Sequence, residues 1–173
     1  MKVRRVVLPA MLCLLGSLSP ATAQPKKPSG KPAPMKLEDP ELYFAFFRSH
    51  NAVDQQIQAS SPAAATQLSS TTAALYGISV GDLPKLTAQT RTFMTNLAAW
   101  STLEQGYVAH QQGAKKLPDI KTLIVYQHQR QRLVMNAHGR IHGALTRTSW
   151  AGLYAYINGS FKAGLKQTAG AAK

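Results

Sequence analysis

Apolar side chains recur every three to four residues along most of the chain after residue 37, which is the period of an amphipathic α-helix. No stretch shows the alternation of apolar and polar residues that is typical of a half-buried strand. Helix-start signals stand at Asp39-Pro40 and Ser61-Pro62, and Gly77 can end the second helix. The pattern therefore predicts an all-α fold, an antiparallel bundle of four to five helices over residues 37–167.

The apolar faces of these helices predict the core. The first helix contributes Tyr43, Phe46, Phe47, Val53 and Ile57, and the third, capped by Asp82 and closed by Gly113, contributes Leu86, Phe93, Leu97, Trp100, Leu103 and Tyr107. The fourth, from about Pro118 to Leu145, contributes Ile120, Leu123, Ile124, Val134, Ala137, Ile141 and Leu145. A last amphipathic segment carries Trp150, Leu153, Tyr154, Ile157, Phe161 and Leu165, with a break expected at Asn158-Gly159. Residues 168–173 are expected to form a disordered tail.

The first 23 residues have the three parts of a secretory signal peptide. A basic start precedes an apolar run over residues 6–18, and small residues at Ala21 and Ala23 form a cleavage site. The run is short for a membrane span, which needs about 20 residues. We therefore expect an exported protein, periplasmic or secreted, cleaved before Gln24 and with no membrane span afterwards. The chain's one cysteine, Cys13, lies within the predicted signal.

Charge is distributed unevenly along the rest of the chain. Residues 24–36 are rich in Pro and Lys, which predicts a disordered linker. Residues 37–114 contain six acids and three bases, whereas residues 115–173 contain ten bases and one acid. On a helical wheel, Arg132, Arg140 and Arg147 lie away from the apolar face of the fourth helix. This basic face is either a solvated surface or a binding face for an anionic partner, which could be an envelope phosphate, an anionic lipid, an acidic protein or extracellular nucleic acid.

Polar residues interrupt the apolar faces of three predicted helices. They are His50 and Asp54 in the first helix, Glu104 in the third, and Gln127 and Arg130 in the fourth. If the third and fourth helices form a hairpin, Trp100 lies opposite Arg130. A buried guanidinium needs a carboxylate, so we predict a largely buried Arg130 paired with Glu104 or, failing that, Asp54. Such a polar layer either fixes the helix register or lines a pocket.

Histidines form a second polar stripe on the fourth helix. His138 and His142 lie one turn apart, and His128 lies further along the same side. Two imidazoles at this spacing suit a Cu, Ni or Zn ion, although no cysteine or carboxylate lies nearby in sequence. The alternative interpretation is a polar flank of the core, and no cofactor is expected.

The motifs do not indicate an enzyme. Residues 77–81 match G-x-S-x-G, but a nucleophile elbow needs a strand that turns into a helix, and here the motif joins two predicted helices. No nucleic-acid recognition module is present, so we expect no specific nucleic-acid partner. The sequence indicates a non-enzymatic exported domain that binds an anionic envelope component or a protein through its basic C-terminal half. The alternative is a small-ligand or transition-metal binder that uses the bundle interior or the histidine stripe.

Residues 129–161 carry a Gln-Arg-Gln-Arg helix that runs into Leu-Thr-x-x-Ser-Trp-x-x-Leu-x-x-Tyr-x-Asn. This stretch resembles exported bacterial helical proteins of unknown function. The resemblance implies a helical fold and no particular activity.

Overall fold

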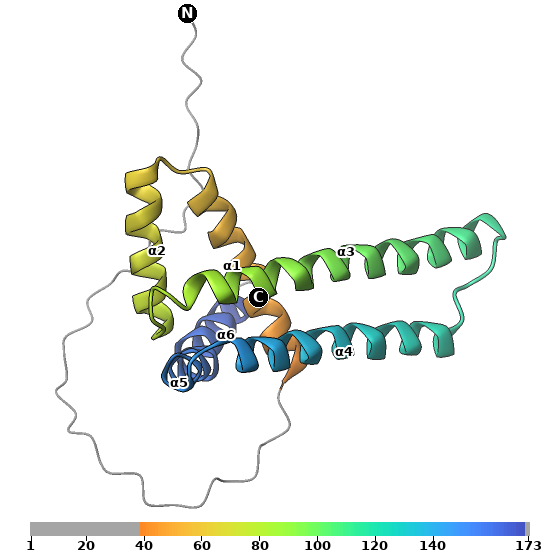
Figure 1. The fold of residues 1–173 in the computed structure, drawn as a ribbon. Coiled ribbons are helices and arrows are strands. Elements are labelled where there is room, and N and C mark those ends of the chain that lie inside the picture. Colours follow the sequence, from red (N-terminus) through yellow and green to blue (C-terminus); the bar gives the residue numbers. More distant parts are fainter. Residues whose placement is uncertain (1–38, 172–173) are drawn as a thin grey trace, which may run out of the picture. The chain divides into compact units, whose positions relative to one another are not determined.

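The computed structural model describes residues 39–171 of the chain, with side chains as far as Thr168 (Figure 1). Its elements are α1 (Pro40–Gln58), α2 (Pro62–Tyr76), α3 (Leu83–Gly113), α4 (Ile120–Ala144), α5 (Arg147–Tyr156), a π-helical turn (Ile157–Phe161) and α6 (Lys162–Ala171). No strand occurs among these residues, so the predicted all-α bundle is confirmed. The predicted signal peptide (residues 1–23) and linker (residues 24–36) lie outside the described residues.

Local sequence signals fix the helix ends. The carboxylate of Asp39 accepts hydrogen bonds from backbone N–H groups of the first turn of α1, and Pro40 occupies the first helical position. Asp119 caps α4 in the same way, so this helix begins at Ile120, two residues later than predicted. Gly77 ends α2 in the left-handed conformation, with φ of 67°, which a residue without Cβ adopts at little cost.

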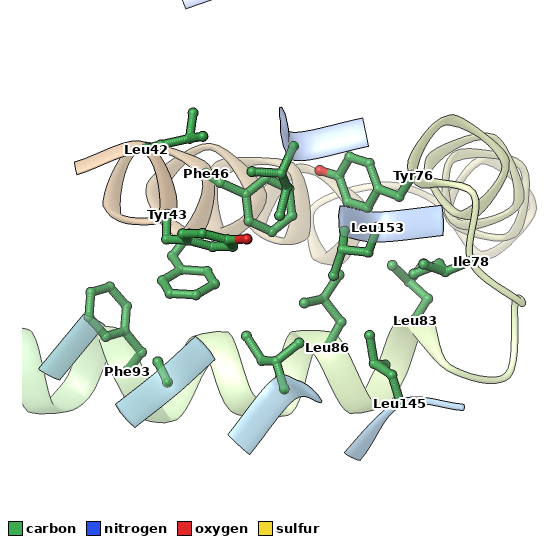
Figure 2. Packing of buried hydrophobic residues seen from close by; sticks show 14 of the residues in the cluster. Leu42, Tyr43, Phe46, Tyr76, Ile78, Leu83, Leu86, Phe93, Leu145 and Leu153 are labelled. Carbon is green, nitrogen blue, oxygen red and sulfur yellow. The ribbon is translucent and has the colours of Figure 1, made fainter. Parts of the chain in front are cut away.

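The core lies around α1, whose aromatic side chains point between the other helices (Figure 2). Tyr43, Phe46 and Phe47 are each at most 1% exposed. Phe46 meets Tyr76 of α2 edge to face, with 5.4 Å between ring centroids, and Phe47 lies 5.1 Å from Phe93 of α3. The aliphatic part comes from the four other helical elements that surround α1: Leu83 and Leu86 from α3, Val134, Ala137 and Ile141 from α4, Leu153 from α5, and Ile157 from the π-helical turn.

A contact between two glycines joins the α2–α3 connection to α5. A Cβ atom added to Gly152 would lie 2.0 Å from the carbonyl oxygen of Gly77, which is closer than real Cβ atoms approach. Only glycine therefore allows α5 to lie this close to the end of α2. The interaction is between two backbones, so neither partner can move aside by changing a rotamer.

The far halves of α3 and α4 project from the core as a two-helix hairpin (Figure 1). We call residues 94–133 the arm, because no residue in this range is fully buried. Three aromatic rings join its helices: Tyr126 of α4 lies 6.3 Å from Trp100 and 5.8 Å from Tyr107, both of α3. Tyr107 Oη also accepts a hydrogen bond of 2.9 Å from the Asp119 backbone N–H and so holds the turn at the end of the arm.

The prediction of core positions was wrong for three residues of the arm. Leu103, Ile120 and Ile124 were expected in the core, but they are 66%, 72% and 45% exposed. The reason is that each helix of an isolated pair covers only the facing side of its partner. A third layer, which α1 and α5 supply at the other end, is missing along the arm.

The C-terminal segment stays helical where a break was expected. The π-helical turn at Ile157–Phe161 contains Asn158 and Gly159 and passes directly into α6. The helix α6 extends to Ala171, past residue 168, where the tail was expected to begin; residues 172 and 173 are outside the described range. Among the described helices, none has the length and apolar character to cross a membrane.

Candidate functional site

One inter-helix polar cluster lies between α1 and α3. The carboxylate of Asp54, which is buried, accepts hydrogen bonds from Arg91 Nε at 2.7 Å and Arg91 Nη2 at 3.0 Å, and a third from Gln58. One turn earlier, His50 is fully buried, and its Nε2 lies 3.2 Å from Thr87 Oγ1. Burial lowers the pKa of His50 to about 4, so the imidazole is neutral at physiological pH. His50 and Asp54 are thus buried polar residues of α1, as predicted.

The predicted partners of this layer were wrong. Arg130 does not meet Glu104 or Asp54. Its Nη2 donates to Glu41 Oε1 at 2.8 Å, and its guanidinium lies over Phe44, 5.3 Å from the ring centroid. The Arg130 side chain is 32% exposed, which is not the deep burial that was expected.

The cause of this error is the position of α1. The first turns of α1 lie beside the base of the arm. Arg130 therefore contacts Glu41 and Phe44 of α1 in place of the carboxylates that were predicted. Trp100, predicted beside Arg130, packs on Tyr126 instead. Gln127 is exposed and Glu104 is half-buried, and neither belongs to the cluster around Asp54. The missed partner is Arg91. On α3, Thr87 and Arg91 lie one helical turn apart, as His50 and Asp54 do on α1, so that Thr87 pairs with His50 and Arg91 with Asp54.

The structure brings two of the three predicted metal-binding histidines together. The rings of His138 and His142 lie 5.0 and 4.7 Å from Trp150, and His138 is also 4.6 Å from Tyr43. His128 is exposed and lies ten residues earlier on α4, about 15 Å along the helix. Among the described residues, no group of three or more His, Cys, Asp or Glu side chains could hold a metal ion. The two histidines are part of an aromatic cluster around Trp150.

The G-x-S-x-G segment lies in the connection between α2 and α3, without the strand that a nucleophile elbow requires. Ser79 Oγ accepts from the backbone N–H of Asp82, and the Ser79 N–H donates to Ser149 Oγ at 3.0 Å. Asp82 in turn accepts from Lys85 and from Thr146 Oγ1, each at 2.7 Å. Hydrogen bonds from Lys85, and after it from Ser149 and Thr146, hold the pKa of Asp82 well below its usual value. The segment therefore anchors the start of α5.

A small cleft opens between α3 and α4 where the arm leaves the core. Its volume is about 30 Å³, enough for one small chemical group. The lining residues are Gln89, Phe93 and Asn96 from α3 and Leu133, Asn136, Ala137 and Arg140 from α4. Three carboxamides and a guanidinium thus surround an apolar floor, and no acidic residue lines the cleft. Because guanidinium and carboxamide N–H groups donate hydrogen bonds, this lining suits an anionic group.

The basic residues of the C-terminal half are almost entirely unpaired. Nine Lys and Arg residues lie between Lys115 and Lys166, and within the described part of the chain only Arg130 forms an ion pair. The other two pairs join acids and bases of the N-terminal half. Arg132, Arg140 and Arg147 are all exposed. The first two lie on α4 as predicted, whereas Arg147, predicted on the same helix, is the first residue of α5. Apart from Arg130, the basic residues of α4 and α5 therefore form no ion pair with the acids that the structure describes.

No protein-family model, no curated protein and no solved structure matches this chain.

Proposed function

We propose that the chain is an exported, non-enzymatic helical domain that binds a phosphate-bearing polyanion of the cell envelope through the basic surface of α4 and α5. The observation that carries the proposal is the cleft beside Arg140. It places a guanidinium and three carboxamides together, with no carboxylate among its lining residues.

The charge distribution supports the same partner. In the N-terminal half, Asp54 and Asp82 each form an ion pair with a base of the same half. Arg132, Arg140 and Arg147 are exposed and form no ion pair with any described residue. An uncompensated field of one sign attracts a partner of the opposite sign and accelerates its association. Export, indicated by the first 23 residues, brings this surface to the envelope.

The proposal is tested by binding of the protein to inorganic polyphosphate at several salt concentrations. Changing Arg132, Arg140 and Arg147 together to Gln should weaken binding at least about tenfold and flatten its salt dependence, because fewer counterions are released. The melting temperature should stay nearly unchanged, since exposed charges alter stability by less than about 0.5 kcal/mol.

A matched pair of single variants separates position from net charge. Arg140→Gln and Arg48→Gln each remove one positive charge from an exposed residue, but only Arg140 borders the cleft. We expect a clearly larger loss for Arg140→Gln. Equal losses for the two variants, or absence of binding by the unchanged protein, would contradict the proposed function.

A further inference from the structure

The end of the arm exposes aliphatic side chains that the fold leaves uncovered. We call residues 115–125 the arm tip. In it, Leu117 is 92% exposed, Ile120 72%, Val125 53% and Ile124 45%. These four lie within nine residues of one another and make up nearly half of the exposed large hydrophobic residues of the described chain. Such a concentration at one place marks an interaction surface, whereas scattered single residues do not.

Lysines stand among these aliphatic side chains. At 3.6 residues per turn, Ile120, Ile124, Lys121 and Val125 fall within about 140° of the circumference of α4, on the side away from α3. Lys115 and Lys116 occupy the turn before Leu117, and all three lysines are exposed. Their long aliphatic stems extend the apolar surface while the ammonium groups stay at its edge.

The tip has a fixed conformation and little negative charge. Lys115, with φ of 54°, reverses the chain after α3, and Tyr107 holds the backbone N–H of Asp119. Asp119 is the tip's single acid, and its carboxylate accepts hydrogen bonds from the Thr122 N–H at 3.0 Å and the Thr122 hydroxyl at 2.8 Å. The carboxylate therefore caps α4 and forms no ion pair with the lysines of the tip.

We propose that the arm tip docks on an anionic lipid bilayer, with its aliphatic side chains inserted into the interface and its lysines against the headgroups. Exposed aliphatic residues bordered by lysines complement both the apolar boundary and the charge of such a surface. A second copy of this chain fits less well, because a symmetric contact of two tips would bring lysines against lysines. The inference deepens the proposed function, on which it rests for the choice of an anionic envelope partner.

Sedimentation with vesicles of phosphatidylglycerol and phosphatidylcholine tests the inference. Leu117→Gln combined with Ile120→Gln should weaken vesicle binding at least about tenfold, because the inserted apolar surface is lost. The control is Leu75→Gln combined with Val80→Gln, which removes two aliphatic side chains that are 61% and 56% exposed outside the arm. The control should bind vesicles like the unchanged protein.

Lysine variants test the charge requirement in the same assay. Lys115, Lys116 and Lys121 changed together to Gln should reduce binding and its dependence on phosphatidylglycerol content. Lys162→Gln combined with Lys166→Gln, outside the tip, should have the smaller effect per charge removed. All of these positions are at least partly exposed, so each variant is expected to fold.

Insertion itself is read from a fluorescent probe. The probe is read in a chain whose own tryptophans are replaced by Trp100→Phe and Trp150→Phe. There, emission of Leu117→Trp should shift to shorter wavelength on vesicle binding and be quenched by brominated lipid chains, whereas Leu75→Trp should show neither change. Vesicle binding that survives loss of Leu117 and Ile120 would overturn the inference. So would absence of vesicle binding alongside intact polyphosphate binding, which would leave the proposed function standing; loss of both would contradict both.

Discussion

The arm and the core share two helices, α3 and α4, which are covered differently in the two regions. In α3, Leu86, Phe93, Trp100 and Tyr107 follow one another at intervals of seven residues. The first two are 0% and 2% exposed, whereas the last two are only half-buried. The periodicity does not change along the helix; the surrounding layers do. The comparison shows that periodicity identifies the inward side of a helix, while burial depends on how many neighbours cover that side.

The residue types follow the same division. In the core, aliphatic side chains of α3 and α4 pack under α1, together with phenyl rings. In the arm, the two helices meet through Trp100, Tyr107 and Tyr126, which are aromatic residues with a polar atom at one end. Tyrosine suits a half-covered position, because the ring packs while the hydroxyl reaches a partner or solvent. Tyr107 does so directly by binding the backbone of Asp119.

The largest expected effect comes from the tightest contact in the core. Gly152→Ala places a Cβ atom 2.0 Å from the carbonyl oxygen of Gly77, and two backbones must separate to relieve it. We expect a loss of about 3 kcal/mol or more in the free energy of unfolding, seen as a fall in melting temperature of roughly 10 °C.

Gly106→Ala is the matched change in the arm. A Cβ atom there would meet nothing within 4 Å, and Gly106 lies within α3. Alanine in an open helical position stabilises by about 0.5 to 1 kcal/mol relative to glycine. Opposite signs for the two variants would sharpen the contrast between core and arm, and equal losses would show that the arm is as tightly packed as the core.

An intermediate effect is expected from pH, through a residue of the core. His50 has a pKa of about 4 in the folded protein against 6.5 in an unfolded chain, because burial disfavours its charged form. The unfolded chain therefore binds more protons between these values. Well above pH 6.5 this residue adds no pH dependence; stability then falls as pH decreases, by roughly 2 to 3 kcal/mol at pH 4.5, and levels off below pH 4.

Urea unfolding at pH 7 and pH 4.5 measures this loss. His50→Gln, which has no titrating side chain at this position, should lose clearly less stability than the unchanged protein over the same interval. Asp54 and Arg91, the charged neighbours of His50, are the same in both proteins. An identical pH dependence for the two would show that His50 is not the group that titrates.

The smallest effect is expected where the arm meets α1. Arg130 pairs with Glu41, whose side chain is 56% exposed, so solvent screens the ion pair. Arg130→Ala should cost about 1 kcal/mol, including the lost contact with Phe44. A double-mutant cycle with Glu41→Ala should give a coupling energy below about 1 kcal/mol. A loss of 3 kcal/mol or more would indicate a buried arginine and a tighter junction between arm and core.

Sequence periodicity predicted the elements of this fold better than their packing. The starts of α1 and α2 and the end of α2 follow from local signals such as Asp39-Pro40, Pro62 and Gly77, which act within a few residues. Asp82 was predicted to cap α3, but its carboxylate accepts from Lys85 and Thr146 and makes no side-chain cap. The position of α1 across the hairpin does not follow from local signals. It decides that Arg130 meets Glu41 and that Arg91 meets Asp54, although each pair is widely separated in sequence.

The candidate site shows the same limit. The exposure of Arg132 and Arg140 could be predicted, because a helical wheel shows which side of α4 faces away from the core. Arg147 is exposed as well, but it begins α5, so the wheel of α4 does not account for it. The cleft beside Arg140 could not be predicted. It depends on the register between α3 and α4, which places Gln89 and Asn96 opposite Asn136. The exposed aliphatic side chains of the tip were missed because their spacing equals that of a covered face.

The protein carries one natural fluorophore in each of the regions compared above. Its two tryptophans are Trp100, beside Tyr126 in the arm, and Trp150, between His138 and His142 in the core. A Trp100→Phe chain thus emits from the core alone, and a Trp150→Phe chain from the arm alone. Denaturation followed by tryptophan emission in each of these two variants distinguishes a molecule that unfolds as one cooperative unit from one whose arm unfolds first.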